Sequence, residues 1–341
     1  MKDVTIYDIA NKLGISASSV SRALNNNQNI SKATREKVKT AAEKMGFRIN
    51  QHASNLRRET PTRLIGIILH KINSQFSINA LYSMEKVIRN AGYDIIIAHS
   101  AESYEQERIN AENLFQRRIE GLIVGLASDT LPLDHFDRYI ENGIPVFLFD
   151  RVKANFPGVK VSLDNFKAAY EATRHLIQQG CKRIVHIAGK QSSAVYVDRL
   201  SGYKKALADH GIPFNRKLVL MRGIDAAAVP LLVKDILEMN PKPDGVFAVN
   251  DLCAVLCMNE LQKAGIKIPQ DIAFVGFNND VISTIINPNL STVNYSGEEI
   301  GEVVARAVID RLEEKKQTCI NYTITLHSQL IIRGSSQRKV R

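Results

Sequence analysis

The chain opens with a short segment that has the polar and apolar pattern of an amphipathic helix. Thr5 and Asp8 stand three residues apart, an arrangement typical of a capping box at a helix start. Gly14 then ends the segment, because glycine adopts the left-handed conformation of a helix C-terminus without strain. The apolar positions between them recur at helical spacing: Ile6, Ile9, Ala10 and Leu13.

Two more short helices follow. Ser16 is placed to cap a second helix that runs to Leu24, and Ser31 to cap a third. The second is expected to bury Val20 and Leu24 and to turn four residues outward: Ala17, Ser18, Ser21 and Arg22. The third is expected to close a small core with Val38, Ala41, Ala42 and Met45. Two short helices around a glycine turn predict a helix-turn-helix unit, whose second helix enters the major groove of DNA. The alternative is an ordinary three-helix bundle.

From residue 63 onward, continuous apolar runs alternate with helical stretches. A helix carrying Ile78, Leu81, Met84, Val87 and Ile88 follows the first run and ends at Gly92. Such alternation predicts parallel sheets that are covered by helices on both faces, an α/β fold. The expected strands are 64–69, 93–98, 121–124, 145–149, 183–188, 245–249 and 272–276.

Polar residues stand just past several of these strands. Asp150 and Arg151 follow one strand, Asn250 and Asp251 another, and 278–280 a third, while His70 and 73–76 follow the first. Ligands bind beyond the carboxyl ends of parallel strands, so these residues are candidate ligand contacts. The alternative is that such side chains cap the next helix, which is at least equally good for Asp164 and Asp251.

The positive charge is concentrated at the start of the chain. The net charge is +10, and residues 1–60 hold 11 Lys/Arg against 5 Asp/Glu, a net of +6, while the remaining 281 residues hold 34 against 30, a net of +4. A local basic excess favours a polyanionic partner. Hydrophobic residues make up 45% of the chain, but no run is long enough for a membrane span. The N-terminus has no signal-peptide pattern and the four cysteines are sparse, which predicts a cytoplasmic protein with no membrane partner.

No enzyme or cofactor pattern is present. The chain contains neither a Walker loop nor a GxGxxG fingerprint, and its eight histidines have no metal-binding spacing. Cys253 and Cys257 stand four residues apart on an expected helix and are interpreted as buried apolar side chains rather than metal ligands. We therefore expect a protein with no catalytic residues, no cofactor and no metal.

The residues of the first helices also carry a family resemblance. The segments 4–10, 14–16 and 20–25 resemble the DNA-binding head of the lactose-repressor (LacI/GalR) family, without gaps. The resemblance implies that Ala17, Ser18 and Arg22 face the bases, and an arginine can bond both O6 and N7 of guanine. It implies backbone contacts, which fix the register of the protein on DNA, for a further set. These further DNA-binding residues are Thr5, Tyr7, Ser16, Ser21, Asn25 and Asn29.

The segment 47–61 resembles the hinge of the same family. In that family a short helix forms on the operator, and Asn50, Ala53 and Leu56 match its positions. Leu56 corresponds to the residue that wedges into the minor groove and kinks the duplex. Ile49 stands where the family usually has a proline, so the backbone before this hinge helix is expected to be less restricted in conformation. The alternative is a plain linker, as Glu59–Thr62 suggests.

The remainder of the chain resembles the sensor core of that family, on segments such as 92–94, 118–123, 144–146, 243–247 and 287–293. The resemblance implies a periplasmic-binding-protein-like core with two doubly wound subdomains joined by three crossings. We expect a helix-turn-helix head at 1–46 and a hinge at 47–61. The core would span 62–341, with an N-subdomain of about 62–162 and 293–320 and a C-subdomain of about 163–292 and 321–341.

By position, the resemblance also implies an effector site made of Phe76, Asp150, Arg199, Asn250 and Asn278. Asp251 and Tyr295 are further candidates. Asn278 departs from the aspartate that many relatives have, which removes a carboxylate and adds an amide donor. A familiar sugar specificity is therefore not transferred by name.

Together these features predict a transcription regulator, a repressor whose operator affinity is controlled by a small molecule, with a sugar or sugar derivative expected. A homodimer on a palindromic site in double-stranded DNA is implied, because one short recognition helix reads few bases. Whether the effector induces or corepresses stays open, as does activation. Two other classes of protein fit less well: a solute-binding receptor, which the added head argues against, and an α/β enzyme, which lacks catalytic residues.

Overall fold

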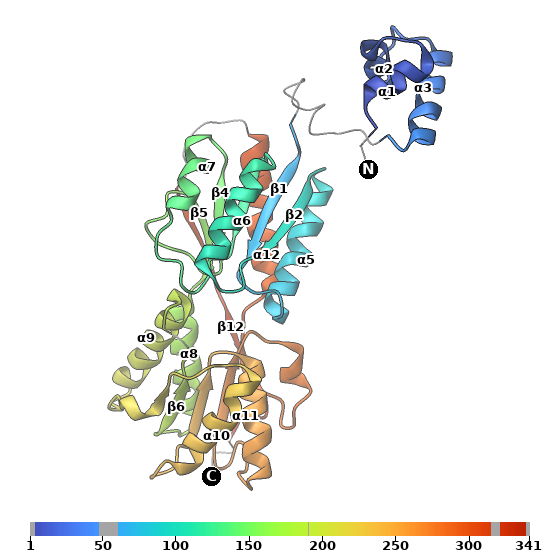
Figure 1. Ribbon diagram of the computed structural model, residues 1–341. Coiled ribbons are helices and arrows are strands. Elements are labelled where there is room, and N and C mark those ends of the chain that lie inside the picture. The colour runs from blue at the N-terminus through green and yellow to red at the C-terminus, as the bar shows by residue number, and fades with distance from the viewer. Residues whose placement is uncertain (1–3, 48–60, 190, 315–320, 339–341) are drawn as a thin grey trace. The chain divides into compact units, whose positions relative to one another are not determined.

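The structure of the protein is a computed structural model that describes residues 4–47, 61–189, 191–314 and 321–338. The chain divides into two compact units, residues 1–62 and residues 63–341. The small unit is helical and is drawn in blue in Figure 1, and the large unit is drawn from light blue to red.

The small unit consists of three helices: α1 (Ile6–Leu13), α2 (Ala17–Leu24) and α3 (Lys32–Met45). The predicted caps are confirmed, since the side chains of Thr5, Ser16 and Ser31 each accept a hydrogen bond from a backbone N–H three residues on. Gly14 joins α1 to α2 in the left-handed conformation, at a φ of 66°. The predicted capping box between Thr5 and Asp8 is present as well.

A core of small apolar side chains holds these helices together. Ile9, Val20, Ala23 and Val38 are fully buried. The prediction that Leu24 is buried was wrong in part: it is half-buried, and Ala23 lies in the core instead. Ala23 stands three residues after Val20 and faces the other helices with it, whereas Leu24 is the last residue of α2 and packs at the margin.

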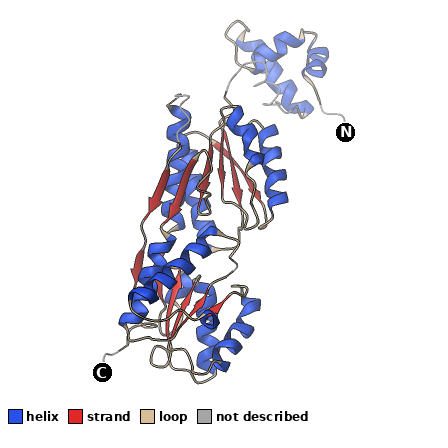
Figure 2. Cartoon of the chain, turned by 90° about the vertical axis from the view of Figure 1, so that its left-hand side faces the viewer, coloured by secondary structure: helices blue, strands red, loops and turns tan. Residues whose placement is uncertain are grey.

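The large unit contains two six-stranded sheets, each covered by helices on both faces (Figure 2). The first sheet has the strand order β11-β5-β4-β3-β1-β2, and all its strand pairs are parallel. Helices α5 (Gln75–Asn90) and α12 (Gly297–Glu313) pack on one face, and α6 (Tyr104–Gln116) and α7 (Asp137–Glu141) on the other. The strands are β1 (Leu64–Leu69), β2 (Asp94–His99), β3 (Gly121–Val124), β4 (Val146–Phe149), β5 (Val159–Leu163) and β11 (Thr323–Leu326).

The second sheet has the order β12-β10-β9-β8-β6-β7. Its pairs are parallel except that β12 runs antiparallel to β10. Helices α8 (Asn165–Gln178) and α9 (Ala194–Asp209) cover one face, and α10 (Val229–Glu238) and α11 (Asp251–Lys263) the other. The strands are β6 (Ile184–Ile187), β7 (Val219–Leu220), β8 (Gly245–Ala248), β9 (Ala273–Phe277), β10 (Ser291–Asn294) and β12 (Gln329–Ile331).

Each sheet with its helices forms one lobe, and the chain passes between lobes after β5, after β10 and between β11 and β12. The expected boundaries need two corrections. Strand β11 falls in the range 321–341 expected for the C-subdomain, but it pairs with β5 in the first sheet. Strand β10 extends the second sheet to residue 294, beyond the expected change of subdomain at 293. In both cases the hydrogen-bonding partner of a short strand decides which lobe it joins.

Glycines let helices approach each other closely in both lobes. A Cβ on Gly297 or Gly301 would collide with the backbone of α5 at Phe76 and Ala80, so α12 lies directly against that helix. Ile78, one of the apolar residues of the expected helix, is 51% exposed, because α5 turns its small residues rather than Ile78 toward α12. Among the residues described, no helix is both long enough and apolar enough to cross a lipid bilayer.

Candidate functional sites

The outward face of α2 carries small and polar side chains. Ser18 and Arg22 are exposed and lie one turn apart, and Ala17 and Ser21 lie half-exposed beside them. The side chain of Arg22 makes no hydrogen bond or ion pair with any other described residue, so its guanidinium is available to a ligand. This face therefore presents an unpaired cation between small side chains, as contact with base edges requires.

Of the other predicted DNA-binding residues of the head, some are exposed and others form hydrogen bonds at the ends of helices. Tyr7 is 63% exposed at the first turn of α1, and Asn29 is exposed beyond α2. Ser16 and Thr5 are committed to capping, and the Thr5 hydroxyl lies 2.7 Å from a carboxylate oxygen of Asp8. Asn25 ends α2 and donates from its amide to the backbone oxygen of Ser21, at 2.7 Å. Asn50, Ala53 and Leu56 lie outside the described residues.

In the large unit, three of the predicted effector residues come together around Tyr295. The Tyr295 ring stacks on Phe76 with 4.6 Å between the ring centroids and 8° between their planes. The Tyr295 hydroxyl donates a hydrogen bond to the Asp150 carboxylate. Arg199 lies with its guanidinium carbon 3.5 Å from the centroid of Phe277 and 5.8 Å from that of Tyr295. We call Phe76, Asp150, Arg199, Phe277 and Tyr295 the Tyr295 cluster.

Arg199 is held firmly although it is almost fully buried. Its Nη1 donates to the backbone oxygen of Val249 at 2.7 Å, and its Nε donates to Oδ1 of Asn165 at 2.9 Å. Burial lowers the pKa of this guanidinium, but arginine keeps its charge in proteins. Both of these partners are neutral groups. The cluster therefore contains a cation whose own hydrogen bonds go to uncharged acceptors, which suits a ligand rich in hydroxyl or anionic oxygens.

A second charged group flanks the cluster. Arg151, next to Asp150, forms a two-bonded ion pair with Glu102, with distances of 2.6 and 2.9 Å. His70 lies beside this pair, where burial and the charge of Arg151 lower its pKa to about 4. Its Nδ1 is buried with no hydrogen-bond partner among the described residues. A buried polar atom of this kind is normally satisfied, so it favours a bound molecule or water at this place.

Asn250 and Asn278 lie outside this set of contacts. Asn250 caps α11, because its Oδ1 accepts a bond of 2.7 Å from the Cys253 N–H, while its amide donates to the backbone oxygen of Ile224. Asn278 has a φ of 117° and its amide reaches Asp280 at 3.5 Å. Among the described residues, neither of these side chains forms a hydrogen bond with Tyr295. The capping alternative raised for strand-end residues thus applies to Asn250.

Asp164 and Asp251, for which capping was an equally good alternative, have different hydrogen-bond partners. Asp164 caps α8 by accepting from the Lys167 N–H at 2.9 Å. Asp251 is fully buried and accepts from the Thr292 hydroxyl at 2.6 Å and from the Asp280 N–H at 2.8 Å. Burial raises the pKa of Asp251 to about 7.

Glu102, Tyr196 and Phe277 were not among the predicted site residues. Glu102 lies three residues beyond β2, so the strand-end rule that selected Asp150 would have found it. Tyr196 lies on α9 with Arg199, 5.7 Å from its guanidinium, and burial raises its pKa. Phe277 is the last residue of an apolar strand, where nothing in the sequence separates a ligand contact from a core residue.

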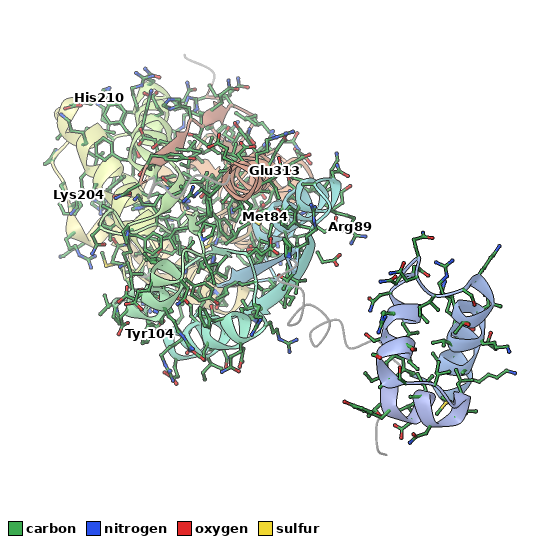
Figure 3. The ribbon with its side chains drawn as sticks, turned by 90° about the horizontal axis from the view of Figure 1, so that it is seen from above. Met84, Arg89, Tyr104, Lys204, His210 and Glu313 are labelled. Carbon is green, nitrogen blue, oxygen red and sulfur yellow. The ribbon has the colours of Figure 1, made fainter. Side chains whose placement is uncertain are left out.

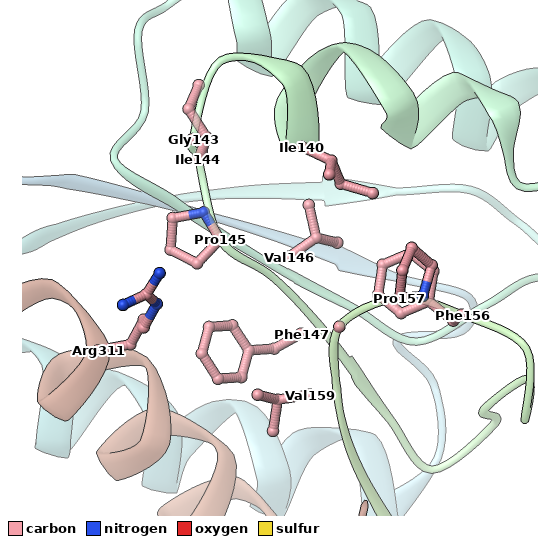
Figure 4. A pocket seen from close by; sticks show the side chains of 11 residues that line it. Ile140, Gly143, Ile144, Pro145, Val146, Phe147, Phe156, Pro157, Val159 and Arg311 are labelled. Atoms are coloured by element: carbon pink, nitrogen blue, oxygen red, sulfur yellow. The ribbon is translucent and has the colours of Figure 1, made fainter. Parts of the chain in front are cut away.

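No group of three or more His, Cys, Asp or Glu side chains in the described part of the chain is arranged to hold a metal ion. A small pocket of about 80 Å³ lies at the other end of the first sheet, between β4, β5 and Arg311 of α12 (Figure 4). Its walls are mostly apolar, and it is far smaller than the roughly 300–1,000 Å³ typical of ligand sites. The candidate ligand site is the Tyr295 cluster, where an arginine, a carboxylate and aromatic rings come together.

Two family profiles match the chain. The profile for bacterial regulatory proteins of the lacI family matches residues 5–50, and that for a periplasmic binding protein-like domain matches residues 173–336. Together they cover the head and much of the large unit.

Whole proteins are similar over nearly their full length. The repressor PurR of Vibrio atlanticus is 27% identical over 97% of this chain and 98% of its own, and the repressor CytR of Escherichia coli is 28% identical over 98% and 96%. Among solved structures, a complex of the regulator CelR with cellobiose is 25% identical, with a TM-score of 0.72 over 97% of this chain and 99% of that one. A lac repressor dimer bound to operator and an anti-inducer has a TM-score of 0.79 at 21% identity, over 99% and 100% of the two chains, and shows the common fold.

Proposed function

The chain belongs to the lacI family of bacterial regulatory proteins, and we propose that it represses transcription by binding operator DNA under the control of a small molecule. The observation that carries the DNA-binding part is the free Arg22 on the exposed face of α2, one turn from Ser18. A guanidinium so placed can bond O6 and N7 of a guanine, and the small Ala17 leaves room for a thymine methyl group. Tyr7, Ser16, Ser21, Asn25 and Asn29 are proposed to contact the DNA backbone, with Thr5 supporting α1.

The proposed effector site is the Tyr295 cluster, with Asn250 and Asn278 as further proposed members. A sugar or sugar derivative fits it, because stacked aromatic rings can cover the apolar face of a sugar while Arg199 and Asp150 bond its hydroxyl groups. The similarity to a cellobiose-bound regulator supports the same class. We propose further that the protein acts as a regulator without catalysis, in the cytoplasm where operator DNA lies, as its repressor relatives imply.

A homodimer is proposed because a palindromic operator presents the same half-site twice. Exposed apolar side chains offer an interface on each lobe. In the first lobe, Ile78 and Tyr82 lie one turn apart on α5, 51% and 66% exposed, near the edge strand β2. In the second, Val281 and Ile285 are 64% and 74% exposed in and after the short 3-10 helix η4 (Val281–Thr284). Patches of this kind mark protein interfaces on soluble domains.

The proposed division of the chain is a head at 1–46, a hinge at 47–61 and an effector-binding core from 62 to 341. The proposed hinge contacts are Asn50, Ala53 and Leu56, with Leu56 as a wedge in the minor groove. Effector binding between the lobes would change the angle between them and so the spacing of two hinges in a dimer.

Selection from a random pool of DNA duplexes tests the proposal most simply. The full chain is expected to enrich one palindromic sequence, and its affinity for that duplex is expected to fall steeply with salt, because phosphate contacts release counterions. A thermal-shift screen of the full chain against sugars, sugar acids and nucleobases then identifies the effector, since a bound ligand stabilises the folded state. Enrichment of no sequence would contradict the proposed function.

A further inference from the structure

A groove of about 550 Å³ lies on the second lobe, between the start of β6, the C-terminal half of α9 and the segment 212–218. Lys204 and His210, which mark this edge of the large unit, stand on the opposite side from Arg89 in Figure 3. The floor of the groove is apolar: the buried side chains of Ile184, Tyr203, Leu207 and Leu218 form its base, and Ile212, Pro213 and Phe214 expose apolar surface beside them. The groove is open to solvent along one side, where Phe214 is 43% exposed.

The rim of this groove is basic. Lys182, Arg183 and Arg216 line it, and no acidic residue does. Lys204 lies beside it with Nζ 4.9 Å from the centroid of the Phe214 ring. None of these four cations forms an ion pair with an acidic side chain in the described part of the chain. We call Lys182, Arg183, Lys204 and Arg216 the basic rim.

In the described part of the chain, Arg183 donates to the backbone oxygen of Pro241 and Arg216 to that of Val219, and both are neutral acceptors. Other cations nearby are instead paired with carboxylates. Lys205, the next residue on α9, pairs with Asp209 at 2.6 Å, and Arg222 pairs with Asp235 at 2.6 Å. The carboxylate of Asp244 lies close to the rim but is already bound by the backbone N–H groups of Lys182 and Arg183, at 2.8 Å each. The positive charge of the rim is therefore left for an external partner.

We propose that the groove docks an acidic peptide segment of a partner protein, with one apolar side chain on the floor and carboxylates against the basic rim. The apolar floor favours a peptide over a small inorganic anion, which would leave that surface in water. The floor also argues against a DNA duplex, since its charged backbone offers no apolar group of matching size. Rim charges spread along an open groove suit an extended chain better than a compact ligand.

The groove and the Tyr295 cluster share helix α9. Tyr203 and Leu207 lie on the groove floor, and Arg199 lies on the same helix, one turn before Tyr203 and about 12 Å from Leu207 for eight residues at the usual helical rise. A docked partner would thus contact the helix that also holds the proposed effector residue. The docking site nevertheless does not depend on the proposed function, because its test needs neither operator nor effector.

The test measures fluorescence anisotropy of a short labelled peptide, with a central leucine between glutamates, titrated with the full chain. Saturable binding is expected, and the double variant Lys204→Glu with Arg216→Glu is expected to weaken it about 10-fold or more. The matched control is Lys234→Glu with Lys263→Glu, which makes the same change in net charge on α10 and α11 of the same lobe. Control and parent are expected to agree within about 2-fold. Phe214→Ala tests the apolar contribution without changing the charge.

Several results would overturn the proposal. One is no saturable binding by the leucine peptide, and another is equal weakening by both double variants, which would mean unspecific attraction. Equal binding of a peptide with glutamates alone would show that the apolar floor contributes nothing. Displacement of the peptide by an unrelated DNA duplex would show that the peptide binds to the head instead of the groove. Circular dichroism of every variant checks that the fold is retained.

Discussion

The hydroxyl of Tyr295 donates a hydrogen bond to the carboxylate of Asp150, joining the segment after β10 to the end of β4. Asp150 stands in the left-handed region at a φ of 60°, a conformation that is costly for most residues and that recurs at functional sites. The same tyrosine stacks on Phe76. One side chain thus connects a crossing between the lobes with two proposed effector contacts.

Removing this hydroxyl tests how much the connection contributes. Tyr295→Phe keeps the stacked ring but leaves the buried Asp150 without its donor, so the free energy of unfolding is expected to fall by about 1–3 kcal/mol. Denaturant unfolding of the full chain measures it. Tyr322→Phe is the control, since Tyr322 is 41% exposed and its loss of a hydroxyl is expected to change little. Equal stability of the parent and Tyr295→Phe would show that Asp150 has another sufficient partner.

The buried carboxyl of Asp251 predicts a pH dependence. Burial raises its pKa from 3.8 to about 7, so the folded chain keeps this proton up to about pH 7 while the unfolded chain loses it near 3.8. The folded state therefore binds more protons between these values, and this contribution to stability is present below pH 3.8 and lost as the pH rises toward 7. The slope is at most about 1.4 kcal/mol per pH unit.

Asp251→Asn removes this contribution. The free energy of unfolding of the parent minus that of the variant is expected to fall as the pH rises from about 4.5 to 7. Comparison at each pH cancels the opposite effect of buried histidines such as His70. Asp310→Asn, at an exposed position of α12, is the control for the loss of a carboxyl group at the surface. A constant difference for Asp251→Asn would contradict the prediction.

Arg22 is expected to matter for specific binding alone. Arg22→Ala removes a guanidinium with no intramolecular partner among the described residues, so it should weaken binding to the selected duplex about 10- to 100-fold and leave thermal stability unchanged. Binding to a random duplex should change by no more than about 3-fold, because that affinity depends on the summed phosphate contacts. Competition anisotropy measures both. A parallel loss on both duplexes would make Arg22 a phosphate contact.

The exposed patches predict the effect of a charge on assembly. Tyr82→Glu would place a carboxylate in the proposed interface, where it has no partner, and should raise the dimer dissociation constant about 100-fold. Sedimentation velocity at micromolar concentration would show a monomer in place of a dimer. Leu231→Glu, on the 51% exposed position of α10, is the matched control and should remain dimeric. A dimeric Tyr82→Glu would place the interface elsewhere.

The sequence predicted most of the regular elements, and local chemistry explains why. The caps at Thr5, Ser16 and Ser31 and the turn at Gly14 depend on residues within a few positions of each other, and all four are present. Continuous apolar strands such as β1 and β4 could also be predicted from the sequence, because parallel strands covered on both faces are apolar throughout.

Strands whose burial depends on distant partners were missed. In β5, Lys160 is only 3% exposed, and its Nζ donates to two nearby backbone oxygens, those of Phe156 and Gly158, and to the side chain of the distant Asn321. In β10, the hydroxyl of Ser291 is buried against residues more than forty positions away, at Arg333 and Ser336. No local pattern reveals such polar satisfaction.

The candidate effector site was also predicted in part. The rule that ligand contacts follow strand ends located Asp150, and the family resemblance added Phe76 and Arg199, which come together around Tyr295. The rule could not predict that the side-chain oxygen of Asn250 caps α11. An asparagine after a strand looks the same in the sequence whether it caps the next helix or contacts a ligand. The hinge residues lie outside the described part of the chain, and their roles stay predictions.

The central claim is that one small molecule changes the affinity of this chain for one DNA sequence. It is tested most directly by titrating the selected duplex with the full chain, with and without a saturating concentration of the compound found by thermal shift. We predict a change in affinity of about 5-fold or more in the parent, the usual size of allosteric coupling, and none in Arg199→Ala. The control Arg222→Ala, at a surface ion pair, should respond like the parent. The same affinity with and without the compound in the parent chain would contradict the claim.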